Sequence, residues 1–363
     1  MHESHDIAIV QEATDPHQVS SRVFESWLTW YKRMLNITQE WAVASGGSPM
    51  FTGHLAFIRW SALQEVSWIE SDSGDRIYWD DQATTEEIDL MLRLRKAGYG
   101  VRLATYHGSG FKEGVALDIF SEINALQKQM YGCSQTIFHP IRYWLFRGPF
   151  TPTFRKLLFS HIGVAYKLST ATYRLSTFAY KVTTVAYLLG FYAIAMVFPL
   201  SIMNYFVSGL IKNVSAYYTI AWKIYVFTLG AFVVLGIIGA SMAKHRLGKT
   251  IFVAALFESV KWLPMTVLFF LGISYHAFIA GLYHLLSINF NRLIFFHTQE
   301  DMGLWRVFRS LRLLYFLLSG LIAIMVYFGR YASPDWKIQT VEAVLPLAAA
   351  VVCHFLLPLT VFI

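Results

Sequence analysis

The order of apolar and charged positions divides this chain into two halves. In the second half, five runs contain no Lys, Arg, Asp or Glu, and they cover residues 182–211, 224–243, 262–291, 313–329 and 343–363. A helix needs about 20 apolar residues to cross the hydrocarbon core of a bilayer, so runs of this length predict membrane-spanning helices. We therefore predict an all-α transmembrane bundle, with segments near residues 182–207, 222–243, 264–288, 312–329 and 343–363.

The third of these segments, 264–288, is expected to be interfacial or re-entrant. Basic loops favour the cytoplasmic side of a membrane, and both the loop 244–249 and the stretch 292–312 are basic. A single crossing between them would put them on opposite sides. The charged residues that precede Pro264 also fit a bent, interfacial element better than a simple span. We expect four firm spans and one interfacial or re-entrant segment, with residues 1–180 facing the cytoplasm.

The first half has the shorter pattern of a soluble domain. Apolar or alternating runs predict strands at residues 6–11, 51–59 and 101–106, and helical periodicity predicts helices at 20–42, 85–97 and 120–131. Strands that alternate with helices are typical of an α/β domain. We assign this cytoplasmic domain to residues 1–150, an interfacial amphipathic segment to 151–181 and the multi-span membrane domain to 182–363.

Composition and charge support this division. The chain has 363 residues, of which 55% are hydrophobic and 15% charged, and this excludes an ordinary soluble domain, a disordered chain and a small disulfide scaffold. Residues 1–150 carry 13 Lys and Arg against 18 Asp and Glu, a balance of −5, whereas residues 151–363 carry 17 against 5, a balance of +12. The cations lie between apolar runs, so membrane topology explains them better than nucleic acid does. Cys133 and Cys353 are far apart and predict no disulfide framework or metal site.

The densest acidic cluster of the first half lies at residues 80–89. Its simplest interpretation is structural, because Thr84 and Glu87 have the spacing of a capping box and Asp89 is four residues from an arginine. The functional interpretation places Glu86 or Glu87 at a helix N-terminus that faces a cleft. There a carboxylate can take a proton from an attacking hydroxyl. The spacing alone favours the structural interpretation.

Two weaker features of the first half also have a structural and a functional interpretation. Gly53 and His54 fall within a predicted strand, where a glycine often marks the close approach of a ligand or of another backbone. Gln127 and Tyr131 are four residues apart and share one helix face. Taken alone, the histidine is typical of a hydrogen-bonded residue within a fold, and the Gln–Tyr pair is typical of a helix interface.

Two further features concern the membrane. The stretch 139–155 is rich in aromatic and basic residues, which is typical of a belt at a membrane surface. Asn213 begins a glycosylation sequon in the short loop that we expect on the outer side, close to the bilayer. We therefore treat Asn213 as a glycosylation candidate.

In this order, the features resemble the C-terminal part of a processive, membrane-embedded family 2 glycosyltransferase. This group includes the cellulose, chitin and hyaluronan synthases, and the likeness is greatest to the fungal cell-surface polysaccharide synthases. The likeness extends from Asp6 to the end of the chain. The stretches that carry it are Gly53-His54 followed by Arg59, Thr85-Glu86-Glu87 ahead of a helix, and Gln127 with Tyr131 where the family has Gln-x-x-Arg-Trp.

The resemblance implies a fold, a reaction and a set of site residues. The fold would be a partial GT-A-like nucleotide-sugar transferase domain of the α/β class, followed by the membrane bundle. Glu87, where the family has Asp, would be the general base, with Glu86 beside it. An acceptor hydroxyl would attack a UDP-sugar with inversion, and the growing polysaccharide would leave through the bundle, which implies the plasma membrane and a cell-wall or cell-surface glycan. The residues that would bind acceptor and substrate are Gly53, His54, Asp89, Gln127 and Tyr131.

The resemblance also implies a cofactor and partners. A divalent metal, Mg or Mn, is expected for the family, but its Asp-x-Asp ligands belong to an N-terminal half that has no counterpart in this chain, and a partner could supply that half. The other expected partners are the UDP-sugar donor, the polysaccharide acceptor and the lipid bilayer. Two alternatives stay open, a catalytically inactive truncated paralogue or a non-catalytic membrane subunit. An unrelated transporter is disfavoured, because the membrane half lacks repeats.

Overall fold

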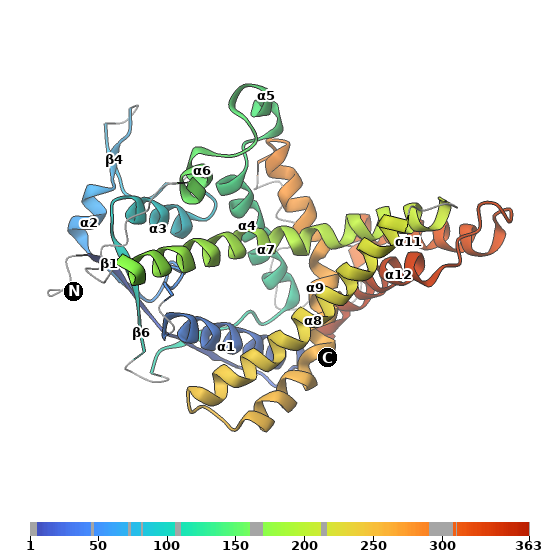
Figure 1. Ribbon diagram of the computed structural model, residues 1–363, viewed down its shortest axis with the longest axis horizontal. Helices are drawn as coiled ribbons and strands as arrows, with labels where there is room; N and C mark the ends of the chain where they lie inside the picture. Colours follow the sequence, from blue (N-terminus) through green and yellow to red (C-terminus); the bar gives the residue numbers. More distant parts are fainter. Residues whose placement is uncertain are drawn as a thin grey trace.

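The computed structural model describes residues 6–44, 47–71, 74–80, 83–105, 110–159, 170–211, 216–289, 308–309 and 311–362. The described chain is mostly helical, with the strands gathered at one end and most of the long helices toward the other (Figure 1). The strands are β1 (Ile7–Glu12), β2 (Asp15–His17), β3 (Ala56–Ile58), β4 (Trp68–Ile69), β5 (Arg76–Ile77), β6 (Gly100–Ala104) and β7 (Lys112–Gly114).

The helices divide between the soluble half and the membrane half of the chain. The helices of the soluble half are α1 (Val23–Ala44), α2 (Trp60–Glu65), α3 (Glu86–Lys96), α4 (Ile119–Ile137), η1 (Ile141–Tyr143), α5 (Trp144–Arg147) and α6 (Pro152–Phe159). The helices of the membrane half are α7 (Thr170–Leu210), α8 (Ala216–Arg246), α9 (Phe252–Leu285), α11 (Arg312–Val326) with the π-helix η3 (Tyr327–Tyr331), and α12 (Val341–Leu356) with η4 (Leu357–Phe362).

The central sheet has three strands in the order β3-β1-β6. β1 lies parallel to β6 and antiparallel to β3, with Val10 opposite Phe57 on one side and Arg102 on the other. The apolar run of β1 is almost wholly buried, as a central strand requires. Leu90 and Leu94 of α3 pack on this sheet together with residues of α2. Two further pairs of short strands, β2 with β7 and β4 with β5, complete the described strands.

The predicted elements of the soluble half are confirmed except around Gly53. The expected strand over 51–59 is wrong in its first part, because only Ala56–Ile58 pairs with β1. Gly53 and Leu55 have positive φ angles, of 83° and 48°, which turn the chain out of the extended conformation. The helix expected at 120–131 is longer, since it continues to Ile137. The soluble half is α/β as expected, but its sheets are small.

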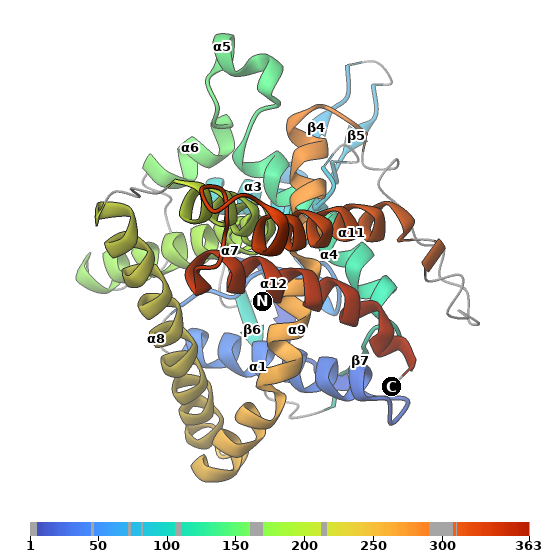
Figure 2. The ribbon, with the colours of Figure 1, turned by 90° about the vertical axis from the view of Figure 1, so that its right-hand side faces the viewer.

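Among the residues that the structure describes, five helices are long and apolar enough to cross a membrane. Figure 1 shows α7, α11 and α12 running along the long axis of the molecule, while α9 runs across them, and Figure 2 shows α8 standing to one side. The candidate spans are Thr184–Leu210, Tyr218–Arg246, Phe252–Leu285, Arg312–Tyr331 and Val341–Thr360. These helices agree with the five segments expected from the charge-free runs.

The helix α9 packs against two helices of the soluble half, α1 and α4. Near the middle of α9, the ring centres of Trp27 in α1 and Phe269 lie 4.6 Å apart, and the indole N–H donates a hydrogen bond of 3.1 Å to Thr266 Oγ1. On its second half, α4 packs against Ala277 and Ala280. The turn before α9 is also tied to α1, since Lys249 Nζ lies 3.1 Å from a carboxylate oxygen of Glu40.

Candidate functional site

The candidate site is built around a loop that comes close to the start of α3. This loop, which we name the Gly53 loop, covers residues 52–55. A Cβ atom added to Gly53 would lie 3.3 Å from Cβ and 3.9 Å from Oε2 of Glu87. Glycine has two structural roles at this position. It adopts the positive φ without strain, and it lets the backbone approach the Glu87 side chain. The sequence prediction that Gly53 marks a close approach agrees with this geometry.

The Gly53 loop is held from inside by Gln11 of β1. The buried side chain of Gln11 donates to the backbone oxygen of His54 at 2.8 Å and accepts from the backbone N–H of Thr52 at 3.2 Å. One amide side chain thus replaces the ladder hydrogen bonds that a regular strand would make. The sequence analysis missed Gln11, because its role depends on a contact between residues that are more than 40 positions apart.

The loop is held from outside by an ion pair. His54 Nε2 lies 2.8 Å from Glu113 Oε1, and the hydroxyl of Thr14 donates to Glu113 Oε2 at 3.3 Å. The hydrogen bond to Glu113 raises the pKa of His54, and a backbone hydrogen bond at Thr52 and the charge of Glu87 act in the same direction. The same pairing lowers the pKa of Glu113. Both side chains are about half exposed, at 50% and 40%, so a ligand can reach them.

The predicted capping box at the start of α3 is wrong. Thr85 is the N-cap residue, and its side chain makes no capping hydrogen bond. The reason is that Thr85 packs against α4, where a Cβ atom added to Gly132 would lie 2.5 Å from Thr85 Oγ1. The N–H of Thr84 is satisfied instead by Gln135 of α4, whose Oε1 accepts it at 3.0 Å.

The Glu87 and Glu86 side chains are both partly exposed at the first turn of α3. Glu86 lies 4.0 Å from Lys128 Nζ of α4, which is a loose ion pair at the surface. Burial raises the pKa of Cys133 in α4 to about 12, and the charge of Glu87 adds to this shift. Glu87 is therefore close to α4 on one side and to the Gly53 loop on the other.

Asp89 has a structural role in this geometry. Its carboxylate lies 2.7 Å from Arg93 Nε, as its spacing predicts. Arg93 also donates to the backbone oxygens of Val66 and Tyr78, both at 3.0 Å, and lies 4.8 Å from the ring centre of Trp68. Asp89 thus orients an arginine that joins α3 to the β4–β5 hairpin.

Gln127 and Tyr131 are buried, with exposed fractions of 2% and 8%. The hydroxyl of Tyr131 donates to the backbone oxygen of Ile288 at 3.1 Å, and its ring meets the imidazole of His284 edge-on at 5.4 Å. Gln127 Nε2 has no hydrogen-bond partner within the described part of the chain. These two residues are thus on the packed side of α4. Lys128, on another side of α4, lies at the surface beside Glu86 of α3.

Met130 stands where the family motif has arginine, and its side chain packs against α9. It is fully buried, and a Cβ atom added to Gly281 would lie 2.7 Å from its Cε. Next to it, Ser134 Oγ hydrogen-bonds His284 Nδ1 at 2.7 Å and accepts from the hydroxyl of Tyr192 at 2.7 Å. We call this set of contacts between α4 and α9 the α4–α9 seam.

The described residues do not fit a metal. Over the ranges that the structure describes, no three His, Cys, Asp or Glu side chains are grouped so that they could hold an ion. The imidazole of His54 already uses Nε2 for Glu113. Asn213, which the sequence analysis also named, lies outside the described residues.

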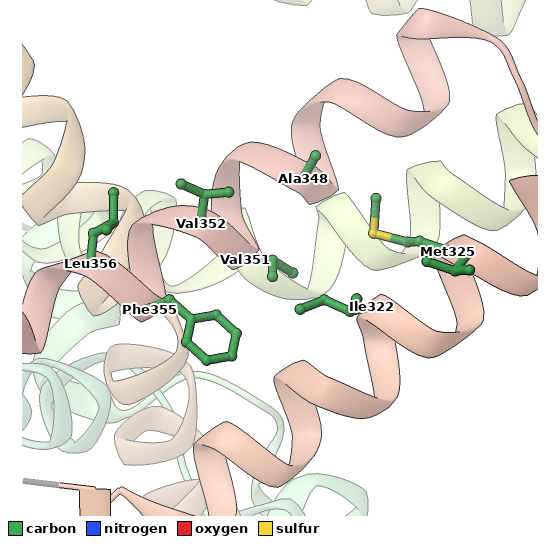
Figure 3. A pocket seen from close by; sticks show the side chains of 8 residues that line it. Ile322, Met325, Ala348, Val351, Val352, Phe355 and Leu356 are labelled. Carbon is green, nitrogen blue, oxygen red and sulfur yellow. The ribbon is translucent and has the colours of Figure 1, made fainter.

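An apolar groove lies away from this site, between α11 and α12. Figure 3 shows Ile322 and Met325 of α11 on one side and Val351 and Phe355 of α12 on the other. The cavity that they line has a volume of about 500 Å³. Its walls offer almost no polar atoms, so it does not suit a sugar or a diphosphate. The Gly53 loop, which carries polar and charged side chains, is therefore the candidate site for a sugar substrate.

Comparisons with known proteins identify the family of this chain. A search of curated proteins gave no match, and neither did a search of solved structures. The family model described as "Glycosyl transferase family group 2" matches residues 1–363, the whole chain. The chain therefore belongs to the glycosyl transferase family group 2.

Proposed function

We propose that this protein is a membrane-bound glycosyltransferase in which Glu87 is the general base. An acceptor sugar hydroxyl loses its proton to Glu87, and its oxygen bonds to the anomeric carbon of a UDP-sugar. The bond from that carbon to the diphosphate oxygen breaks, and UDP leaves with the electron pair, so the configuration inverts. The observation that carries this proposal is the approach of the Gly53 loop to the Glu87 side chain, 3.3 Å from an added Cβ to Glu87 Cβ.

The Gly53 loop supplies the geometry that a general base needs. A base must lie within hydrogen-bond distance of the proton that it takes, which requires fixed walls on both sides of the acceptor. Gln11 and Glu113 hold the loop from two directions, and α4 holds the start of α3. In the proposal His54 and Gly53 contact the acceptor, and Asp89 acts as a positioning residue through Arg93.

Gln127 and Tyr131 enter the proposal as positioning residues. Both are buried, and Tyr131 binds the end of α9 through its hydroxyl. They therefore hold the acceptor side of the site through α4, whose opposite surface carries Lys128 beside Glu86. The GT-A-like fold, the polysaccharide product and the likeness to fungal cell-surface synthases rest on the motif resemblance.

The membrane half is proposed to carry the product across the bilayer. α7, α8, α11 and α12 would span the membrane. α9 would lie in the interface, because it runs across α7, α11 and α12 (Figure 1) and packs against α1 and α4. Both ends of α9 then face the side of the soluble half, which we propose to be the cytoplasmic side of a plasma membrane. A thiol-reactive probe added to that side should label Val253→Cys and Leu286→Cys alike. Labelling of one position from each side would contradict this placement.

The expected metal plays no part in the steps derived above. The described residues offer no cluster for it, so a donor complex with Mg or Mn would need ligands from elsewhere. The burial of Gln127 and Tyr131, which keeps both side chains from an acceptor, favours a second candidate function, a non-catalytic membrane subunit that needs a partner for catalysis.

One experiment separates the two functions. The purified full chain in lipid vesicles is incubated with radiolabelled UDP-sugars, Mg²⁺ or Mn²⁺ and an oligosaccharide primer, and the label in the primer is counted. A glycosyltransferase transfers label from at least one donor and releases UDP. A subunit without catalytic activity transfers none from any donor in the panel, and this result would overturn the proposal.

A further inference from the structure

The loop between α4 and α6 projects from the body of the molecule. Figures 1 and 2 both show α5 at its tip, standing clear of the other helices. The loop is closed at its neck, where the N–H of His139 donates to the oxygen of Pro149 at 2.8 Å and the N–H of Thr151 donates to the oxygen of Ile137 at 3.0 Å. The rings of Phe138 and Phe150 stack across the neck at 5.5 Å.

The tip of this loop is held in one conformation by its own contacts. The indole of Trp144 donates to the oxygen of His139 at 2.6 Å, and the N–H of Gly148 donates to the oxygen of Trp144 at 3.0 Å. Gly148 ends α5 with a φ of 74°, which a glycine adopts without strain. The tip is thus a built element, whose exposed side chains are held outward by the fold.

The side chains at the tip are large and apolar. Leu145 is 88% exposed and Phe146 is 83% exposed, and Ile141, Trp144 and Phe150 around them are also exposed. Each such side chain in water forgoes the gain of burial, about 25 cal/mol per Å² of apolar surface. A cluster of this kind at a projecting tip is typical of a surface that binds a partner.

The charge around the tip is positive. Arg142 and Arg147 lie over the ring of Tyr143, with 4.6 and 5.1 Å from each guanidinium carbon to the ring centre. The chain contains no Asp or Glu between Glu122 and Glu258. The tip therefore combines an apolar pair with two arginines and an amphipathic aromatic ring.

We infer that residues 141–147 insert into the headgroup layer of an anionic bilayer leaflet, with Leu145 and Phe146 among the acyl chains and Arg142 and Arg147 on lipid phosphates. Arginine binds phosphate through a planar fork, and basic residues near a membrane are attracted to anionic lipids. Figure 1 shows the tip at the level along the long axis where α9 crosses the candidate spans. The proposed membrane therefore lies next to the tip. A soluble protein partner would have to bring an acidic surface of its own to the two arginines.

The test is fluorescence quenching by lipids brominated on their acyl chains. The full chain carries a Cys353→Ala change, because Cys133 is fully buried and does not need replacement. A fluorophore is attached at Leu145→Cys or, as a matched control, at Ile69→Cys. Ile69 is also an exposed apolar residue on a hairpin, 64% exposed, and β4 lies at the end of the molecule away from α11 and α12 (Figure 1).

In vesicles of phosphatidylcholine with phosphatidylglycerol, we expect several-fold stronger quenching at position 145 than at position 69. Omitting phosphatidylglycerol, or adding Arg142→Gln and Arg147→Gln, should weaken the quenching at position 145 only. Equal and weak quenching at the two positions would overturn the inference, and so would quenching at 145 that ignores the anionic lipid. A label at 145 that is shielded only at high protein concentration would point to a second copy of the chain and would also overturn it.

Discussion

Two regions of the soluble half share the helix α4, and they differ in what they leave exposed. On one side, the start of α3 and the Gly53 loop keep Glu87, His54 and Glu113 partly open to solvent. On the other side, the α4–α9 seam buries Met130, Tyr131 and Ser134 against α9. The first region has the charged, accessible groups that chemistry needs, and the second has the dense packing that fixes a helix.

This difference explains why the family motif at α4 can change without loss of the fold. An arginine at position 130 would be a buried charge against Gly281, whereas methionine fills the same space with a flexible apolar chain. The motif resemblance implies that Gln127 and Tyr131 bind the acceptor, but both side chains are buried. The charged side chains that a ligand can reach, His54 and Glu113, lie at the Gly53 loop. Chemistry and support thus occupy opposite sides of α4.

The strongest expected effect comes from the contact between the two regions. In Gly132→Ala the new Cβ meets Thr85, whose nearest atom lies 2.3 Å away, so α3 must move from α4. We expect the free energy of unfolding to fall by about 1–3 kcal/mol. Because Glu87 moves with α3, transfer should also fall on the order of 10²-fold.

Thermal unfolding and sugar transfer in vesicles measure both effects of Gly132→Ala. Gly114→Ala is the matched control, since a Cβ atom there meets nothing within 4 Å. If Gly132→Ala behaves like Gly114→Ala in both measurements, α4 does not position α3 in the way described.

The next effect concerns the Gly53 loop alone. Gly53→Ala combines a strained φ of 83° with a Cβ only 3.3 Å from Glu87 Cβ. Gly74→Ala has almost the same strain, at a φ of 76°, but meets nothing within 4 Å. Both should lose about 1 kcal/mol of stability, and only Gly53→Ala should lower transfer. If the two variants transfer sugar at the same rate, the Gly53 loop has no role in the reaction.

The His54–Glu113 pair predicts a dependence on pH. A raised pKa of His54 stabilises the fold below the ordinary value of 6.5, and this part is lost as the pH rises through the raised pKa. A lowered pKa of Glu113 stabilises the fold above 4.5, and this part is lost as the pH falls through the lowered pKa. The difference in unfolding temperature between the wild type and His54→Gln should therefore be largest between these two values.

Unfolding temperatures measured from acid to alkaline pH test this prediction. Glu113→Gln should flatten the same profile, because it removes the partner that shifts the pKa of His54. The effect is modest, since both side chains are about half exposed and water screens the pair. Parallel profiles for the wild type and both variants would show that the pair does not form.

The smallest effect is expected in the α4–α9 seam. In Gly281→Ala the nearest atom is the terminal Cε of Met130, which can turn aside, so the loss should be under about 1 kcal/mol. Gly272→Ala on the same helix is a stringent comparison, because its Cβ would lie 2.9 Å from the backbone oxygen of Cys353. A larger loss of unfolding temperature for Gly281→Ala than for Gly272→Ala would contradict this packing.

The sequence predicted the regular elements better than the site. The apolar run of β1, the periodicity of α3 and the charge-free runs each depend on neighbouring residues, and the structure confirms them. The Gly53 loop was predicted as a strand, because its alternation is local whereas its conformation depends on Gln11, which is more than 40 residues away.

The candidate site shows the same limit. Glu87 and Gly53 were both named from the sequence, but their contact depends on the packing of a loop on a helix that starts 33 residues later. Glu113 was not named as a site residue, since nothing in its own segment points to His54. The capping box failed for a related reason, because Thr85 packs against Gly132 of a helix that is distant in sequence.

The most direct test of the account compares Glu87→Gln with Glu86→Gln in the vesicle transfer assay. The two residues are neighbours in the first turn of α3, and both changes remove one charge, but only Glu87 lies against the Gly53 loop. If Glu87 is the base, Glu87→Gln lowers transfer on the order of 10²–10⁴-fold while Glu86→Gln stays close to the wild type. Transfer that survives Glu87→Gln, or that falls equally in both variants, would contradict the account.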